Sequence, residues 1–383
     1  MDNKKEYQAL FSETLAKIDS ENKNLTKMNI LVSGKSGVGK STLINAVFGE
    51  ELADTGVGKP MTNKINLIAK KGFPIQIYDT VGLELKATKF DVKSILKVIS
   101  KNDIKKLIQK KQKTKGADDD IHVAWYAISG NSARIEKVEI DLINWIINQG
   151  IPVILVLTKS FDQTESKRLK QELLDVVPRA SAVVRTLAKP SDTTDAFGVE
   201  ELIETTFDVL PDGINTAFVH SQSACIELKK REAQKVVTSS MAKNFGIGFA
   251  PLPGMDAPLM MGAQTAMIAK ITNIFGVDVR KKQIETIILS MLGVYGAMIA
   301  GKSLAGGIAK LVPGIGTIGG GLISGSVGMV ITGALGRTYI ELMTLVVTKK
   351  VDLSAITPNE LTDILVSLMP KFLPNFPKQL KLK

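Results

Sequence analysis

Cysteine and histidine are rare in this chain of 383 residues, which contains one Cys and two His. The single cysteine, Cys225, excludes an intramolecular disulfide framework and fits a reducing compartment. The two histidines, His122 and His220, leave little material for a histidine-based metal site. Residues 1–27 lack the apolar core of a secretory signal and are predicted to form a charged amphipathic helix on the surface. These absences together predict a cytoplasmic protein.

The net charge of +11 is unevenly distributed along a chain of ordinary globular composition, with 23% charged and 44% hydrophobic residues. From residue 211 onward there are 18 Lys and Arg against 10 Asp and Glu, so most of the basic excess lies in the more apolar half. Basic and apolar character together favour association with an anionic membrane surface. A solvated basic face without a partner explains the charge equally well. No RNA-binding module is visible, so a nucleic-acid partner is not expected.

Two domains are predicted from the change of pattern along the chain. Residues 28–210 alternate between short β-branched runs and helical stretches, which predicts an α/β fold with a mostly parallel sheet between helices. Strands are expected at 28–34, 64–70, 74–80, 121–129, 151–158 and 181–188, and helices near 39–48, 88–112, 135–148, 163–176 and 198–209. The second and third strands are close enough to form an antiparallel hairpin. Residues 211–383 are predicted to form an all-α domain, with one amphipathic helix over 214–243.

A phosphate-binding loop is predicted between the first strand and the first helix. The run GKSGVGKS satisfies G-x-x-x-x-G-K-[ST], with a strand leading in and a helix leading out. Its glycines let consecutive backbone N–H groups face a phosphate at the start of the helix. Lys40 would bridge the β- and γ-phosphates, and the Ser41 hydroxyl would bind Mg²⁺. The expected nucleotide-binding residues of this loop are Gly34, Ser36, Gly37, Val38, Gly39, Lys40, Ser41 and Thr42.

Two further segments are expected to complete the phosphate and metal site. Asp79 closes the apolar strand PIQIYDT and is followed by Gly82, a spacing that suits a Mg²⁺-linked carboxylate and a backbone N–H aimed at the γ-phosphate. Thr62, in the loop before the second strand, would close over Mg²⁺ and the γ-phosphate. Lys40, Thr62 and Gly82 are therefore the expected catalytic residues, and Ser41, Thr62 and Asp79 the expected metal ligands.

The order GKSGVGKS, Thr62, DTVG and TKSFD resembles translation-factor-class GTPases of the Era/Ras-like kind over about residues 28–210. The resemblance implies a switch that binds GTP or GDP with Mg²⁺ and changes conformation on hydrolysis. In such proteins the TKSFD segment reads the guanine ring, here through Thr158, Lys159 and Asp162. A later backbone N–H, at Ala188 here, contacts the guanine oxygen. An ATP-dependent enzyme that shares the phosphate loop stays an alternative.

Two positions depart from that family pattern. Leu83 stands where many relatives carry a glutamine that orients the attacking water. Slow hydrolysis is therefore expected unless a partner, a homodimer through this domain or another residue supplies the missing group. Phe161 stands where the base-reading aspartate is usual. A one-residue bulge that brings Asp162 into place is the expected repair.

Small residues recur every fourth position in two segments of the second domain that are joined by a Pro-Gly turn, over 286–336. Such stripes allow two helices to pack very closely, either in a membrane or in a soluble core. Residues 311–336 carry no charge and are long enough to span a bilayer. A buried hairpin is favoured, and a membrane-inserting hairpin remains an alternative.

The helical part resembles an uncharacterised domain appended to bacterial Era-like GTPases, and more distantly the architecture of immunity-related GTPases. The overall prediction is a slowly hydrolysing GTP-binding switch whose helical domain contacts a membrane or a protein partner. The alternative is a nucleotide-gated protein that inserts into or remodels membranes through its Gly-rich hairpin.

Overall fold

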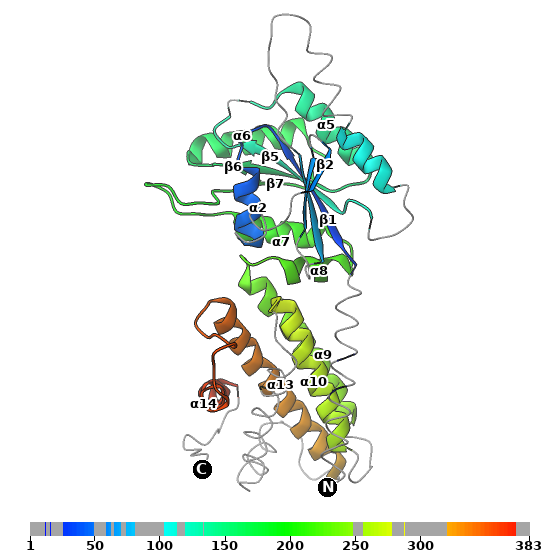
Figure 1. Ribbon diagram of the computed structural model, residues 1–383, viewed down its shortest axis with the longest axis vertical. Helices are drawn as coiled ribbons and strands as arrows, with labels where there is room; N and C mark the ends of the chain where they lie inside the picture. The colour runs from blue at the N-terminus through cyan, green and yellow to red at the C-terminus, as the bar shows by residue number, and fades with distance from the viewer. Residues whose placement is uncertain are drawn as a thin grey trace, which may run out of the picture. The chain divides into compact units, whose positions relative to one another are not determined.

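The protein forms two compact units, Leu25–Cys225 and Ile226–Lys383, the second of which includes Met1–Asn24 (Figure 1). We call the first the sheet unit and the second the helical unit. The computed structural model describes residues 12, 16, 26–49, 59–62, 65–69, 74–80, 103–112, 119–132, 134–247, 256–277, 287 and 320–372. Of the predicted N-terminal helix, it describes Ser12 and Ala16, which are both helical and exposed.

The sheet unit is built on a seven-stranded sheet in the order β2-β3-β4-β1-β5-β6-β7. Its strands are β1 (Met28–Gly34), β2 (Lys59–Thr62), β3 (Ile65–Ala69), β4 (Ile75–Thr80), β5 (Val123–Ser129), β6 (Val153–Thr158) and β7 (Ala182–Arg185). The pairs β4–β1, β1–β5, β5–β6 and β6–β7 are parallel, whereas β2–β3 and β3–β4 are antiparallel. The predicted α/β fold and the predicted β3–β4 hairpin are both confirmed.

Helices cover both faces of the sheet, which forms the middle of three layers (Figure 1). They include α2 (Lys40–Phe48), α5 (Lys137–Asn148), α6 (Gln163–Val176), α7 (Val199–Val209) and α8 (Ile214–Ser221), together with residues 103–112, the described part of the helix predicted over 88–112. On the face of α5 and α6, Leu31, Tyr126 and Leu155 pack in one apolar core with Leu142 and Leu169. Because β1, β5 and β6 are buried on both faces, they are almost continuously apolar, as is typical of central parallel strands.

The opposite face of the sheet is covered by α2, α7 and α8. The Phe48 ring of α2 stacks on Trp125 of β5, with 5.9 Å between ring centroids, and meets Phe218 of α8 edge-on. The buried Trp125 indole donates its Nε1–H to Thr206 Oγ1 of α7 at 3.1 Å. The indole therefore satisfies its donor inside the core, which fixes α7 relative to the sheet.

The segment after α7 differs from its sequence-based prediction. Instead of one helix over 214–243, the chain forms α8 and then α9 (Ile226–Ile247). Between them, the Gln222 side chain exchanges two 2.9 Å hydrogen bonds with the Cys225 backbone. The Ser223 N–H donates to Val47 O of α2 at 2.9 Å. Since α8 packs on the sheet, the two units divide after Cys225, whereas the expected division lies at residue 210.

The helical unit contains α9, α10 (Asp256–Phe275), α13 (Gly320–Val347), α14 (Pro358–Leu368) and the 3-10 turn η1 (Met369–Lys371). Its core includes the fully buried Tyr339 of α13, whose hydroxyl lies 2.6 Å from Thr272 Oγ1 of α10. α14 begins with a capping box, in which Thr357 and Glu360 exchange hydrogen bonds, and with a proline in its first turn.

The C-terminal part of the small-residue stripe faces other helices of this unit. A Cβ added at Gly336 would lie 2.6 Å from Val237 Cγ2 of α9, and one added at Gly333 would lie 2.8 Å from Met241 Sδ. The glycines thus permit an approach that larger side chains would block. Of the predicted hairpin over 286–336, only Ile287 and 320–336 fall within the described residues. Among the helices that the structure describes, none combines the length and hydropathy needed to cross a bilayer.

Candidate functional site

The phosphate loop connects β1 to α2 at the carboxyl edge of the sheet. Gly34, Gly37 and Gly39 have φ values of 141°, 74° and 104°, which side-chain-bearing residues rarely adopt. A side chain at Gly34 would also collide with the Ala127 carbonyl of β5. α2 begins with Gly39 as its N-cap, without a side-chain cap or an acidic residue in the first turn. The N-terminal N–H groups of α2 are therefore available to an anion, where the helix dipole favours negative charge.

The other residues of the loop differ in their exposure to solvent. Ser36, Gly37 and Ser41 are exposed to solvent, Thr42 is half-buried, and Val38 is buried. The open side of the loop thus carries the predicted phosphate-binding backbone and the Ser41 hydroxyl, while Val38 anchors it to the protein.

Lys40 and Asp79 form the charged centre of the site. Lys40 is 8% exposed, and its Nζ donates to the carbonyl oxygens of Gly34 at 3.2 Å and Lys35 at 3.0 Å. Burial lowers the pKa of Lys40, although the charge of Asp79 opposes this effect. Burial raises the pKa of Asp79 to about 6, against the opposing effect of Lys40. Both groups are thus kept partly dehydrated, as binding groups commonly are.

Asp79 is suited to a role near a metal ion. It lies in β4 opposite Val32 of β1, so it is beside the strand that leads into the phosphate loop. Its Oδ1 is buried without a hydrogen-bond partner. An orphaned carboxylate oxygen and the exposed Ser41 hydroxyl are hard oxygen donors that fit Mg²⁺. The described residues contain no cluster of three or more His, Cys, Asp or Glu.

Of the two residues expected to contact the γ-phosphate, Thr62 and Gly82, the structure describes Thr62. Thr62, expected in a loop, lies at the end of β2 and pairs with Ile65 of β3. The short edge strand KPMT has little β-branched character, so its pairing with β3, rather than its own propensity, places it in the sheet. Gly82 and Leu83 lie outside the described residues.

The end of β6, which begins the segment predicted to contact the nucleotide base, is hydrogen-bonded directly to the phosphate loop. The buried Thr158 Oγ1 lies 2.6 Å from Val38 O and 3.1 Å from Ile128 O. Lys159 has φ = 52°, and its Nζ donates to Gly37 O at 2.6 Å. A Cβ added at Gly39 would lie 3.7 Å from Lys159 Cε, so the aliphatic stem of Lys159 covers the loop. The structure therefore brings the two predicted segments together.

The residues after Lys159 take separate directions. Ser160 is fully buried and donates its Oγ–H to Leu157 O at 2.9 Å, whereas Phe161 is 44% exposed. Asp162 is the N-cap of α6, with Oδ1 accepting from the N–H groups of Thr164 and Glu165. Ala188 is half-buried and follows Leu187, which pairs with Phe197.

Sequence reasoning missed an ionic link between the phosphate loop and α5. Lys35 Nζ lies 2.8 Å from Glu136 Oε1 and 3.0 Å from the buried Glu139 Oε2. Burial and then the Glu139 charge raise the pKa of Tyr126, so its hydroxyl stays protonated and donates to Glu139 at 3.2 Å. The available signal was the E-x-x-E run of Glu136 and Glu139, which forms a capping box at the start of α5.

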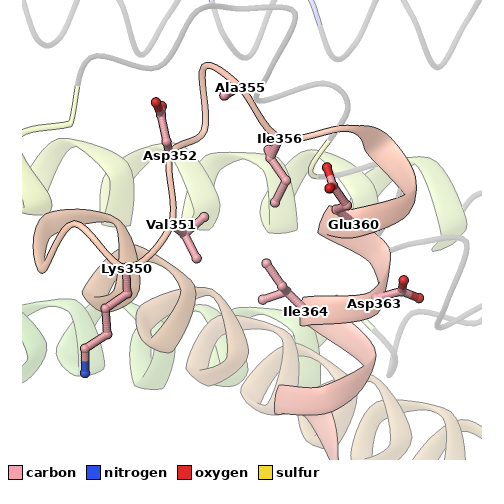
Figure 2. A pocket seen from close by; sticks show the side chains of 8 residues that line it. All are labelled: Lys350, Val351, Asp352, Ala355, Ile356, Glu360, Asp363 and Ile364. Atoms are coloured by element: carbon pink, nitrogen blue, oxygen red, sulfur yellow. The ribbon is translucent and has the colours of Figure 1, made fainter.

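A hollow of about 520 Å³ lies in the helical unit, between α14 and the segment before it. In Figure 2, Ile356 and Ile364 face each other across it, while Lys350 and Asp363 point away. The Asp352 carboxylate accepts from Ser354, and the Glu360 carboxylate accepts from Thr357. Because these carboxylates hold a turn and a helix cap, their arrangement is explained by local structure.

The fold and the site define a P-loop nucleotide-binding domain. They combine a glycine loop at a helix N-terminus, a buried lysine and an aspartate on the adjacent strand. Residues 29–159 match the family model described as "50S ribosome-binding GTPase". This part of the chain is therefore a P-loop GTPase domain. The predictions of a GTPase and of GTP or GDP as its nucleotide are confirmed at the level of this class, and Mg²⁺ stays a prediction.

Similarity to individual proteins is distant or short. The chain is 24% identical over 217 residues to the probable GTP-binding protein EngB of Petrotoga mobilis, which covers 54% of this chain and 98% of that protein. It is 45% identical over 56 residues to "Translocase of chloroplast 108" of Physcomitrium patens, 14% of this chain and 6% of that protein. A solved structure of a probable GTP-binding protein engB shares 21% identity, with a TM-score of 0.35, over 47% of this chain and 97% of that chain.

Proposed function

We propose that this protein is a Mg²⁺-dependent GTP-binding switch with slow GTP hydrolysis. The observation that carries the proposal is the pair of Lys40 and Asp79 beside the phosphate loop. The Asp79 carboxylate has a buried oxygen without a partner, and the Lys40 ammonium is held by two backbone carbonyls. A nucleotide with its Mg²⁺ would supply the opposite charge that each group requires.

The proposed roles rest on the sequence motifs and, for the described residues, on their positions. The N–H groups at the start of α2 and the Lys40 ammonium would bind the β- and γ-phosphates. Ser41, Thr62 and Asp79 would hold Mg²⁺ directly or through water, and the ion would neutralise charge that develops on the phosphates. Thr62 and Gly82 would sense the γ-phosphate and release it after hydrolysis. Thr158 and Lys159 would fix the base-side loop to the phosphate loop.

Slow hydrolysis is proposed because no side chain in these motifs is a general base. Leu83 cannot hydrogen-bond a water, so catalysis would depend on positioning and electrostatics alone. A second copy of the chain that meets this domain, or a protein partner, would supply the missing group.

The proposed division of labour gives nucleotide binding to the sheet unit and partner contact to the helical unit. The basic and apolar composition of the helical unit supports a membrane surface or a protein as its partner. The packing of Gly336 of the stripe, and of the nearby Gly333, against α9 supports a helical core for this part of the chain over a membrane-inserted one. This division of labour is consistent with a cytoplasmic protein that is related to Era-like GTPases and, more distantly, to immunity-related GTPases.

A titration of the purified full chain with fluorescent GTP and GDP, with and without Mg²⁺, tests the proposal. Binding should require Mg²⁺ for GTP, and unlabelled ATP should compete poorly. Lys40→Ala should abolish binding, because the phosphates lose their buried cation. Lys167→Ala, at an exposed position of α6, is the matched control and should bind as the wild type does. A GTP affinity of Lys40→Ala equal to that of the wild type would contradict the proposed function. So would a preference of the wild type for ATP over GTP.

A further inference from the structure

The base-side loop lacks the carboxylate that a guanine reader would need. Asp162 is the first acidic residue after Lys159, and its Oδ1 accepts from Thr164 N at 2.8 Å and from Glu165 N at 3.0 Å. A guanine clamp needs both carboxylate oxygens, one for N1–H and one for the 2-amino group. One of these oxygens is already committed to capping α6.

The start of α6 is also held from another element. Arg185 at the end of β7 donates through Nη1 to Gln163 Oε1 at 2.8 Å and to Ser166 Oγ at 3.1 Å. Moving Asp162 toward the phosphate loop would break the helix cap and pull Gln163 away from Arg185. The bulge expected from the sequence would therefore cost several hydrogen bonds, whereas the observed N-cap satisfies two backbone donors that α6 would otherwise leave open.

The position two residues after Lys159 offers no polar group instead. The Phe161 N–H donates to Lys159 O at 2.8 Å in a tight turn, and the ring is 44% exposed. Ser160 cannot substitute, because it is fully buried with its Oγ bonded to Leu157 O and its N–H bonded to Thr186 O. An apolar ring at this position neither attracts nor repels a 2-amino group.

One purine substituent can still be read. The N–H groups of Thr186 and Leu187 donate to Leu157 O and Phe197 O, but within the described residues the Ala188 N–H makes no hydrogen bond. This donor lies at the position to which the family resemblance assigns the contact with the guanine oxygen, and it matches a 6-oxo acceptor but not a 6-amino group. The aliphatic stem of Lys159 over Gly39 would support the ring in either case.

We infer that the site accepts 6-oxopurine nucleotides as a class, guanine and hypoxanthine alike, because the described loop after β6 offers no free carboxylate pair to the 2-amino group. This inference rests on the proposed nucleotide-binding function and specifies its substrate. Lys159 and Ala188 select the purine, and Phe161 is the residue that removes discrimination between GTP and ITP.

Competition against a fluorescent GDP, with GTP, ITP and ATP as unlabelled ligands and the full chain as the protein, tests this inference. The wild type should bind ITP within about threefold of GTP, because loss of the 2-amino group leaves no charged acceptor unpaired. ATP should bind at least about tenfold more weakly, because its 6-amino group meets the Ala188 donor.

Three variants locate the specificity. Phe161→Asp places a carboxylate at the open position and should raise the preference for GTP over ITP to more than about tenfold. Phe161→Asn is the matched uncharged control and should leave the two affinities similar. Asp162→Asn keeps a side-chain acceptor for the α6 cap and should leave the GTP-to-ITP ratio unchanged.

Each outcome bears on the inference. A wild-type preference for GTP over ITP that disappears in Asp162→Asn would show that Asp162 reads the base and would overturn it. Equal binding of ATP would overturn the assignment of 6-oxo recognition. If none of the three nucleotides binds, the proposed function itself is overturned. This outcome differs from those that overturn only the inferred base specificity.

Discussion

Single residues in this site are held in states that a ligand would complete. Asp79 has a raised pKa and an oxygen without a partner, and Lys40 is buried with a lowered pKa. Thr158, in contrast, is fully committed to backbone carbonyls of the phosphate loop and β5. Asp79 and Lys40 can therefore take part in ligand binding, whereas Thr158 holds the loops in place.

Thr158→Val tests the positioning role. The substitution keeps the shape of the side chain but removes the hydroxyl that lies 2.6 Å from Val38 O, leaving that buried carbonyl without this donor. We expect a loss of about 1–3 kcal/mol in unfolding free energy, with weaker GTP binding. Denaturant unfolding and nucleotide titration measure the two effects. Thr158→Ser is the control that keeps the hydroxyl, and equal weakening by both substitutions would argue against this bond.

At the scale of elements, the helical unit depends on close approach of α13 to α9 and α10. Gly336 lies where any side chain would press on Val237 and Met267. The buried Lys229 of α9 donates to the carbonyls of Ile274 and Phe275 at the end of α10, at 3.0 and 3.1 Å. The glycine therefore lets α13 approach α9 and α10, and the buried Lys229 side chain links α9 to the end of α10.

Gly336→Val should disrupt the α13–α9 contact. The added atoms overlap Val237, so we expect a destabilisation of about 1–3 kcal/mol. Thermal unfolding of the full chain followed by circular dichroism measures it, and preserved GTP affinity would show that the sheet unit is intact. Arg337→Ala, at the exposed neighbouring position, should have little effect. An unchanged midpoint for Gly336→Val would contradict the observed packing.

Lys229 should make stability depend on pH. Burial lowers its pKa to about 7, below the value of 10.5 that applies when it is unfolded. Between these values the unfolded chain binds more protons, so the lysine's contribution to stability rises as the pH increases from 7 toward 10. We expect a gain of about 1–3 kcal/mol over two pH units. Lys229→Met should flatten this dependence in denaturant unfolding at pH 7 and 9, and an equal slope in both proteins would contradict the shift.

At the scale of the whole molecule, the sheet unit and the helical unit combine a nucleotide site with a separate helical core. The site has no described side chain suited to activating water, and the position usual for a water-orienting glutamine is Leu83. Under the proposed function, hydrolysis is the step at which a second molecule would have most effect.

We expect slow turnover of GTP by the full chain at high dilution, on the order of 10⁻³ s⁻¹, the scale of unassisted GTPases. If a second copy completes the site, the rate per molecule should rise with protein concentration. Phosphate release measured across a wide concentration range, beside light scattering for the oligomeric state, tests this expectation. A rate that stays constant while dimers form would exclude completion by a second copy.

The α/β order, the phosphate loop, the Asp79 strand end and most helix boundaries of the sheet unit could be predicted from the sequence. These features depend on local periodicity, glycine conformation and fixed spacing, which neighbouring residues carry. The sequence did not show that Thr62 lies in an edge strand, that a Gln222–Cys225 turn ends α8, or that Lys35 pairs with Glu139. Asp162 shows the difference most clearly: its spacing suggested a base reader, but in the fold its Oδ1 caps α6, and Arg185 of β7 holds the first turn of that helix. The Lys35–Glu139 and Arg185–Gln163 contacts join residues distant in sequence, and the choice among competing hydrogen bonds is made only when the chain is folded.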